Sequence, residues 1–322
     1  MSTKIQKPML KYNKLKTNQT QFLSLTSLTV SEFDELLIDF DQDWRSYIDY
    51  HTFEGKPRVR AYKEKSNALL VDVTDKLLFI LYYLKNQPLQ ESIGAIFGMT
   101  QPQANRCISL YRMILHSTLN RLKCLPCRNA EALLKQLSHN DKKEFYTDGI
   151  ERSIPRNVDW EVQKDQYSGK KKMHTVKNTI FCDANAQIHY LSATYEGKTH
   201  DKKINEQEDI ELPTNSQCYQ DTGFVGYTPK GEHITIIMPD KKPKGGELSE
   251  EQKQRNKEIA SIRVRVEHVI SGIKRLRIIK DKIRAWANDF RDQAMEIACG
   301  LHNFRLKFRP WNYPRAEKIL QT

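Results

Sequence analysis

The stretch Phe145-Tyr146-Thr147-Asp148-Gly149 decides the fold of this chain of 322 residues. Residues that favour strands are followed by an aspartate and a glycine, which is the pattern of a strand that ends at a polar turn. Thr175 to Cys182 repeats the strand pattern. Ile188 to Tyr195 repeats it again after a short polar loop, so these two stretches predict a hairpin.

Outward from these strands the pattern alternates between helix and strand. Strands mixed with helices in this order predict a mixed α/β domain over 142–322. Asp148 and Asp221 each follow a predicted strand, and strand ends are where such folds place their sites. The further elements we predict are a polar helix after Thr199, strands over 217–220 and 234–238, and basic helices from Ser249 to about Lys280.

The segment before this domain is helical. Thr74 is the N-cap candidate of a helix over 75–85, a short helix follows Pro88 and ends at Gly98, and Thr100 can cap a third helix. A short helix, a glycine turn and a helix with a polar leading end form a helix-turn-helix layout, although plain helical bundles share it equally often. Gln and Asn suit adenine edges, and Arg suits guanine or phosphate. The polar leading residues are Gln101, Gln103, Asn105 and Arg106.

These patterns divide the chain into four parts. We predict an N-terminal arm with an amphipathic helix within Ser31 to Tyr50 (1–63), an all-α helix-turn-helix domain (64–122), a linker (123–141) and the α/β catalytic domain (142–322).

Composition excludes several classes of protein. With 39% hydrophobic and 29% charged residues, the chain is neither collagen-like nor of low complexity. The longest uncharged apolar run, 77–84, is too short to cross a bilayer, and the lysine-rich start lacks a secretory signal. We therefore expect a cytoplasmic protein without a membrane partner. Six scattered cysteines fit a reducing compartment, and Cys124 and Cys127 are expected to be structural thiols rather than half of a zinc site or a redox pair.

The net charge of +12 is concentrated near the C-terminus, where residues 241–322 alone have a net charge of +10. Glu267 lies in this region, with Arg263 four residues before it and Lys274 seven after it on the same helical face. If the predicted strands adjoin and this helix packs over their ends, Asp148, Asp221 and Glu267 converge. A cluster of carboxylates needs cations, and hard oxygen ligands select Mg²⁺ or Mn²⁺. Two such ions are the arrangement that cleaves phosphodiesters.

Five motifs in order carry a resemblance to a known family. The chain resembles DDE transposases of the insertion-sequence and Harbinger-related class (insertion-sequence-five-like), and the preceding helices resemble that family's N-terminal helix-turn-helix domain. Ala260 stands where some of those relatives have a Tyr, so the resemblance does not extend to a hairpin-forming step that depends on it. The motifs are Thr147-Asp148-Gly149-Ile150-Glu151, Tyr167 to Lys177, Glu196 to Asp201, Asp221-Thr222-Gly223-Phe224 and Arg263-x3-Glu267-x6-Lys274.

The resemblance implies an RNase H-like catalytic fold that uses a pair of Mg²⁺ or Mn²⁺ ions. It also implies binding to the terminal inverted repeats of a mobile element, hydrolysis at the element ends, and joining of the 3′-hydroxyl to target DNA. By position, Asp148, Asp221 and Glu267 match the family's catalytic, metal-binding acids. Asp201 competes with Asp221 for the second ligand position, and we favour Asp221 because it closes a predicted strand.

Several basic and aromatic residues have alternative roles. The basic residues beside the predicted site would bind the phosphate backbone, although charge runs are usually only solvated. His174 and His200 could bond DNA or serve structure, and Trp286 and Trp311 could stack on a base but suit a core better. The basic DNA-binding candidates are Lys170, Lys171, Lys172, Arg263, Lys274 and Arg275.

We therefore expect a transposase that acts on double-stranded DNA as a homodimer or higher oligomer and associates with the nucleoid. An inactive descendant that only binds DNA as a regulator is the alternative from the binding class, and a site-specific nuclease without strand transfer is a third possibility. The three acids argue against the regulator.

Overall fold

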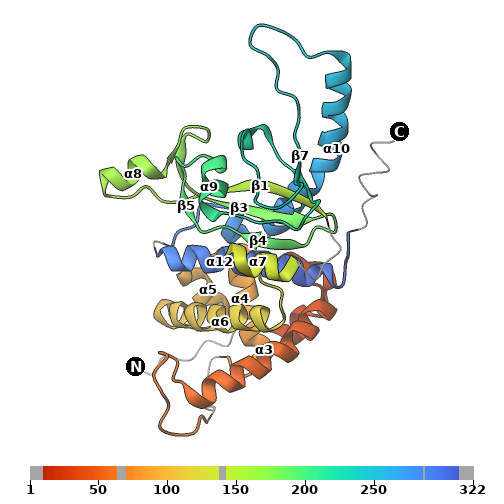
Figure 1. Ribbon diagram of the computed structural model, residues 1–322. Coiled ribbons are helices and arrows are strands. Elements are labelled where there is room, and N and C mark those ends of the chain that lie inside the picture. Colours follow the sequence, from red (N-terminus) through yellow and green to blue (C-terminus); the bar gives the residue numbers. More distant parts are fainter. Residues whose placement is uncertain (1–9, 64–69, 138–142, 286, 312–322) are drawn as a thin grey trace. The chain divides into compact units, whose positions relative to one another are not determined.

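The computed structural model describes residues 10–63, 70–137, 143–285 and 287–311. Contacts divide the chain into a helical unit, Met1–Cys124 with Arg275–Lys280, and a sheet unit, Leu125–Lys274 with Asp281–Thr322 (Figure 1). None of the helices in the described ranges is both long and apolar enough to span a membrane.

Seven helices build the described part of the helical unit. The predicted helices near 31–50, 75–85, 88–98 and after Thr100 are all present. The third of the seven begins at a capping box in which Thr29 and Glu32 bond each other's backbone N–H groups. The helices are α1 (Tyr12–Leu15), α2 (Gln19–Thr26), α3 (Val30–Tyr50), α4 (Val73–Asn86), α5 (Gln90–Phe97), α6 (Gln101–Arg121) and α11 (Arg277–Lys280).

The junction of α5 and α6 depends on two glycines. Gly98 ends α5 with φ 71°, and a Cβ on Gly94 would lie 2.6 Å from the Met99 carbonyl oxygen, so a side chain at Gly94 would force this turn apart. Thr100 then caps α6, as predicted. The predicted cap of α4 was wrong: the N-cap is Asp72, and Thr74 lies inside the helix.

The sheet unit combines seven strands with helices, as the mixed α/β prediction required. Its helices are α7 (Ala130–Leu137), α8 (Trp160–Gln166), α9 (Asp201–Glu208), α10 (Glu250–Ile273) and α12 (Asn288–Leu306), with a short 3₁₀ turn at Thr222–Phe224. Its strands are β1 (Glu144–Ser153), β2 (Tyr167–Ser168), β3 (Met173–Asp183), β4 (Ile188–Leu191), β5 (Tyr195–Glu196), β6 (Gln217–Tyr219) and β7 (Thr235–Ile237).

The sheet is mixed, with the order β2-β3-β1-β6-β7, and β4 and β5 also pair with β3. Strands β1 and β3 are antiparallel, whereas β1, β6 and β7 are parallel to one another. The central strand β1 therefore connects the antiparallel and the parallel parts of the sheet.

Alternation along β1 sends neighbouring side chains to opposite faces. Phe145 packs in an apolar cluster with α7 residues such as Leu133, while the next residue, Tyr146, accepts a hydrogen bond from Arg265 of α10. Helices α7 and α10 therefore cover opposite faces of the sheet.

Three sequence expectations about this unit need correction. Asp148 does not end a strand, because β1 stays paired with β3 as far as Ser153. The predicted strand from Ile188 to Tyr195 is split into β4 and β5, since the Asn178 amide bonds the carbonyls of Ser192 and Ala193 between them. The helices α7, α8 and α12 were not predicted.

The six cysteines, all within the described ranges, are free thiols. The Cys127 thiol donates to Gln136 Oε1 at 3.0 Å, and burial raises its pKa. The Cys127 thiol is therefore partly buried and bonded within the protein.

Candidate active site

The candidate site begins with Asp148 on β1, the strand that connects the antiparallel and the parallel parts of the sheet. Burial raises the pKa of Asp148 to about 6, and the carboxylates of Asp221 and Asp201 add to this rise. The backbone N–H of Gly149 and the guanidinium of Arg263 oppose it. Asp148 therefore lies among both like and opposite charges.

Asp221 reaches the site from β6, the parallel neighbour of β1. Tyr146 is level with Tyr219 in the register of these strands, and their rings stack at 4.9 Å. Asp221 follows β6 by two residues and is near enough to Asp148 to raise its pKa. Asp221 Oδ1 accepts the Gly223 N–H at 2.7 Å, so its carboxylate begins the turn that follows β6.

Asp201 approaches the same place from the start of α9. A Cβ on Gly149 would lie 3.1 Å from the Asp201 carboxyl carbon, so a side chain there would push against Asp201, and glycine leaves room for this close approach. The Lys177 ammonium on β3 lies 3.3 Å from a carboxylate oxygen of Asp201. It also donates a hydrogen bond to the Thr199 carbonyl at 2.9 Å. Two sequence motifs separated by about fifty residues thus form one contact.

Helix α10 lines the site with cations. The Arg263 guanidinium lowers the pKa of Asp148. Burial and the neighbouring Lys171 lower the pKa of Lys274, whereas the carboxylates of Asp148 and Glu151 raise it. Glu267 is exposed and lies on the same side of the helix as Arg263, because the two are four residues apart. Arg265, 2% exposed, fixes this helix by donating to Tyr146 at 2.7 Å.

The donor set suits a hard divalent cation. Carboxylate oxygens are the ligands that Mg²⁺ and Mn²⁺ prefer, and neighbouring carboxylates that raise one another's pKa gain from a cation between them. Throughout the described ranges, however, no three His, Cys, Asp or Glu side chains are close enough together to hold an ion. Convergence of Glu267 with Asp148 and Asp221 thus stays a prediction.

Comparison with known proteins gives information on the family. Residues 147–303, which contain all the acids above, match the family described as DDE superfamily endonuclease. A probable transposase for the insertion sequence element IS702 of Microchaete diplosiphon is 27% identical over 237 residues, which cover 74% of this chain and 82% of that protein. These two matches support a DDE transposase. No solved structure gives a significant match.

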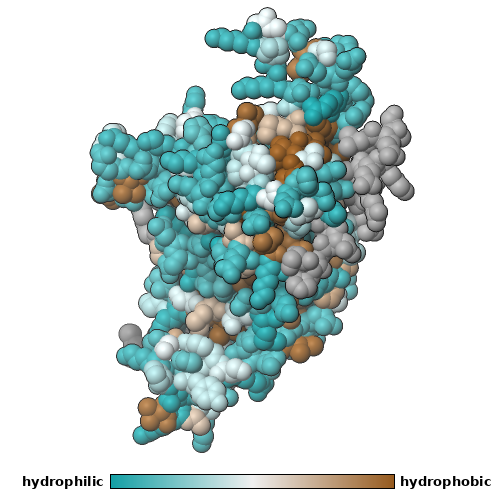
Figure 2. Space-filling view, viewed as in Figure 1, coloured by the Kyte–Doolittle hydropathy of each residue, from teal (hydrophilic) through white to brown (hydrophobic). Residues whose placement is uncertain are grey.

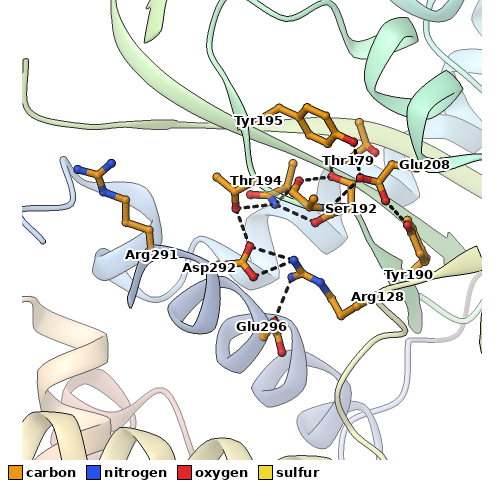
Figure 3. Close-up of polar contacts among 12 residues, drawn as sticks. Arg128, Thr179, Tyr190, Ser192, Thr194, Tyr195, Glu208, Arg291, Asp292 and Glu296 are labelled. Atoms are coloured by element: carbon orange, nitrogen blue, oxygen red, sulfur yellow. Dashed lines mark hydrogen bonds and ion pairs between the residues drawn. The ribbon is translucent and has the colours of Figure 1, made fainter. Parts of the chain in front are cut away.

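In the matched region, a polar network fixes α9, which carries Asp201 (Figure 3). Glu208, at the far end of α9, accepts hydrogen bonds from Tyr195 at 2.7 Å, from the backbone of Ala193 at 2.9 Å and from Tyr190. These bonds tie α9 to the strands that pair with β3. Glu208 therefore positions Asp201 without reaching it.

A second part of the network holds α12 (Figure 3). Arg128 donates to Asp292 at 2.8 Å and lies 3.3 Å from Glu296, and Thr194 donates to Asp292 at 2.6 Å. Both acids thus face the same guanidinium, whereas Asp148 has two carboxylates among its neighbours.

The predicted basic residues are spread over both units. Lys170, Lys171 and Lys172 are exposed in the turn before β3, and Lys171 is near enough to affect the pKa of Lys274. Arg275 belongs to the helical unit, where its carbonyl accepts from Lys85 at 2.8 Å.

The polar residues at the start of α6 bond within the protein. Gln103 closes the capping box with Thr100, while Gln101 and Asn105 both bond Gln90 of α5. Arg106 is exposed. Three of the four residues predicted to contact base edges therefore also stabilise the α5–α6 junction.

The histidines and tryptophans considered as DNA contacts lie in different places. Trp286 lies outside the described residues. Trp311 packs edge-on against His268 and His302, at 6.0 and 5.4 Å between ring centroids. His200 is the N-cap residue of α9, and His174 faces the Tyr167 ring at 5.7 Å.

Sequence reasoning missed Lys177 and Glu208. Lys177 stands in a recognised motif, but its contact with Asp201 depends on the tertiary structure and has no local signal. Glu208 gave no local signal, because its partners come from strands whose boundaries had been predicted differently.

Proposed function

We propose that this protein is a DNA transposase that cuts the phosphodiester at the ends of a mobile element and joins the freed 3′-hydroxyl to target DNA. The observation that carries the proposal is the buried carboxylate of Asp148, whose pKa is raised by burial and by Asp221 and Asp201 and is lowered by Arg263. The match to DDE endonucleases and the similarity to a probable transposase support it.

Asp148 and Asp221, with Glu267, would hold the metal ions, and Asp201 is the competing ligand. Bound there, a pair of Mg²⁺ or Mn²⁺ ions supplies Lewis-acid activation of the attacking oxygen and of the leaving oxygen. Arg263 and Lys274 would bind the scissile phosphate and offset the charge of the acids. Burial at Asp148 excludes water and strengthens both effects.

The remaining finer assignments belong to the same proposal. We assign the mixed sheet to the RNase H-like class and the α5–turn–α6 pair to a helix-turn-helix that binds the terminal inverted repeats, with Arg106 contacting DNA. Two element ends must be brought together, so we include a homodimer or higher assembly on double-stranded DNA.

Incubation with a labelled terminal-repeat duplex and Mg²⁺ or Ca²⁺ tests the proposal. We expect nicking and joining with Mg²⁺ only. Glu267→Gln should lose cleavage and keep binding, whereas Glu251→Gln, an exposed acid on the same helix, should cleave normally. A wild-type protein that binds but never nicks would support the regulator instead, and nicking without joining would support the nuclease.

A cysteine exchange separates the two candidates for the second ligand. Thiolate binds Mg²⁺ poorly and accepts softer ions, so Asp221→Cys should be inactive with Mg²⁺ and partly restored by Mn²⁺. Asp201→Cys should lose activity without such restoration. The reverse result would give the ligand role to Asp201.

A further inference from the structure

The segment that joins β1 to β3 carries an aromatic hollow. Residues 154–172, which we name the arm, contain α8 and the basic turn before β3. Figure 1 shows α8 standing away from the body of the sheet, and Figure 2 shows an apolar patch on this projection within a hydrophilic surface.

The hollow has a volume of about 440 Å³, within the size range of small-molecule sites. Trp160 and Tyr167 are 59% and 44% exposed, so both rings are available to a ligand. Large aromatic rings left exposed on a protein commonly mark an interaction site. The lining residues are Arg156, Trp160, Gln163, Lys164, Tyr167 and His174.

The lining is held in place before any ligand binds. Arg156 Nε donates to Gln163 Oε1 at 2.8 Å, and the Gln163 amide donates to the Asn157 carbonyl at 2.7 Å. The Lys164 ammonium lies 5.5 Å from the centre of the Trp160 ring. A ligand would therefore cost little ordering entropy at these side chains.

The charge of the hollow favours a polyanion. Two of its six lining residues are cations and none is an acid, and one of these cations, Lys164, also pairs with Glu161 at 3.0 Å on the exposed side of α8. The arm as a whole has five Lys and Arg against three Asp and Glu, and the full chain has a net charge of +12. A second copy of the same basic chain would be repelled, whereas a nucleic acid combines phosphates for the cations with π-faces for the rings.

Two lysines connect the arm to the candidate active site. Lys171 of the arm affects the pKa of Lys274, which in turn is affected by Asp148. His174 in the hollow is six residues along β3 from Ile180, the partner of Asp148, which corresponds to about 20 Å. At 3.4 Å per nucleotide, this span equals roughly six nucleotides of DNA.

We propose that the hollow binds an unpaired base of the DNA strand roughly six nucleotides from the cleaved phosphate, with the base stacked on Trp160 and Tyr167 and the flanking phosphates on Arg156 and Lys164. This inference rests on the proposed function, because it takes DNA as the substrate.

The test measures binding of a fluorescein-labelled 20-nucleotide single strand by anisotropy, with EDTA present so that cleavage plays no part. Loss of one stacking partner should weaken binding about 5- to 150-fold in Trp160→Ala, and Trp160→Phe should recover most of it. Val158→Ala is the matched control, since Val158 is 92% exposed on the same arm and does not line the hollow. Circular dichroism checks that each variant is folded.

The outcomes separate the two proposals. If the wild type binds the strand and Trp160→Ala weakens binding no more than Val158→Ala, the base site is wrong and the proposed function is untouched. If the wild type binds neither single-stranded nor duplex DNA, the proposed function fails and the base site with it. If Trp160→Ala instead dissociates an oligomer in light scattering while DNA binding is unchanged, the hollow is a protein interface and the base site is wrong.

An abasic scan then locates the base. Single abasic nucleotides are placed along a terminal-repeat substrate with an unpaired flank. Binding should fall most near the sixth nucleotide from the cut, and this dip should vanish in Trp160→Ala. A flat profile in the wild type would overturn the proposal.

Discussion

The sheet unit contains two groups of acids whose electrostatic surroundings differ. Asp292 and Glu296 both face Arg128, which satisfies their charge. Asp148 instead has Asp201 and Asp221 as neighbours, and its pKa is raised. Acids that face a cation are compatible with a stable fold, whereas a carboxylate whose pKa is raised by burial and by like charges costs folding free energy, as is common at functional sites. The contrast therefore lies between Asp148 and the two acids that face Arg128.

The largest effect is expected for Asp148→Asn, which removes the carboxylate with the raised pKa. The substitution keeps the shape and removes a ligand, and the Lewis-acid contribution it abolishes amounts to several kcal/mol, so cleavage should fall at least about a thousandfold. Thermal stability should be unchanged or higher, because a repelled, half-buried charge is gone. Gel-based nicking assays and thermal melts check both. A lower melting temperature would show that the carboxylate is structural.

The pH dependence of stability sharpens the contrast. The pKa of Asp148 rises from 3.8 to about 6 in the folded state, so the folded state binds more protons between these values. Its destabilising effect is therefore absent below pH 3.8 and complete above about pH 6. Relative to Asp148→Asn, the wild type should lose up to about 3 kcal/mol of unfolding free energy between pH 4 and pH 7. Urea unfolding in EDTA measures this, and a constant difference would contradict it.

On the structural side, Arg128→Met should destabilise the protein by about 2 kcal/mol, since it leaves Asp292 and Glu296 without their cation in a partly buried place. Lys253→Met is the control, because its ion pair with Glu250 is exposed and should contribute less than about 0.5 kcal/mol. Chemical unfolding compares the two variants. Equal effects would mean that the Arg128 network adds nothing to the fold.

The smallest effect is expected for Tyr195→Phe. This change removes one of the hydrogen bonds that Glu208 accepts, at a cost of about 1 kcal/mol. Because Glu208 positions α9, cleavage should also fall several-fold, whereas Tyr50→Phe, at a ring 73% exposed, should change neither quantity. Stability loss with unaltered cleavage would show that α9 does not need this anchor.

Local patterns predicted α3 to α6 of the first unit and most strands of the second, whereas α1 and α2 were not predicted. Gly98 and Thr100 carry their own backbone signals, and the β3 run from Thr175 to Cys182 is long and apolar. The far end of β1 was missed because Asp148-Gly149 resembles a turn by itself, and only its pairing with β3 keeps it extended.

The acids of the site were predictable as residues but not as neighbours. Asp148, Asp201 and Asp221 all stand in recognisable motifs. Their distances depend on the parallel register of β1 and β6 and on the glycine that admits Asp201, and both are tertiary features that one sequence does not contain. Glu208 was missed for the same reason.

The position of α11 has a consequence for how this chain is made. It packs on α4 with Ile278 and Ile279 each 1% exposed, yet it is encoded between α10 and α12 of the other unit. During synthesis, the apolar surface of α4 that α11 covers stays uncovered until the ribosome has made residue 280. A single cut in the gene therefore cannot release the helical unit as an intact module, and a copy shortened before α11 would leave both units incomplete.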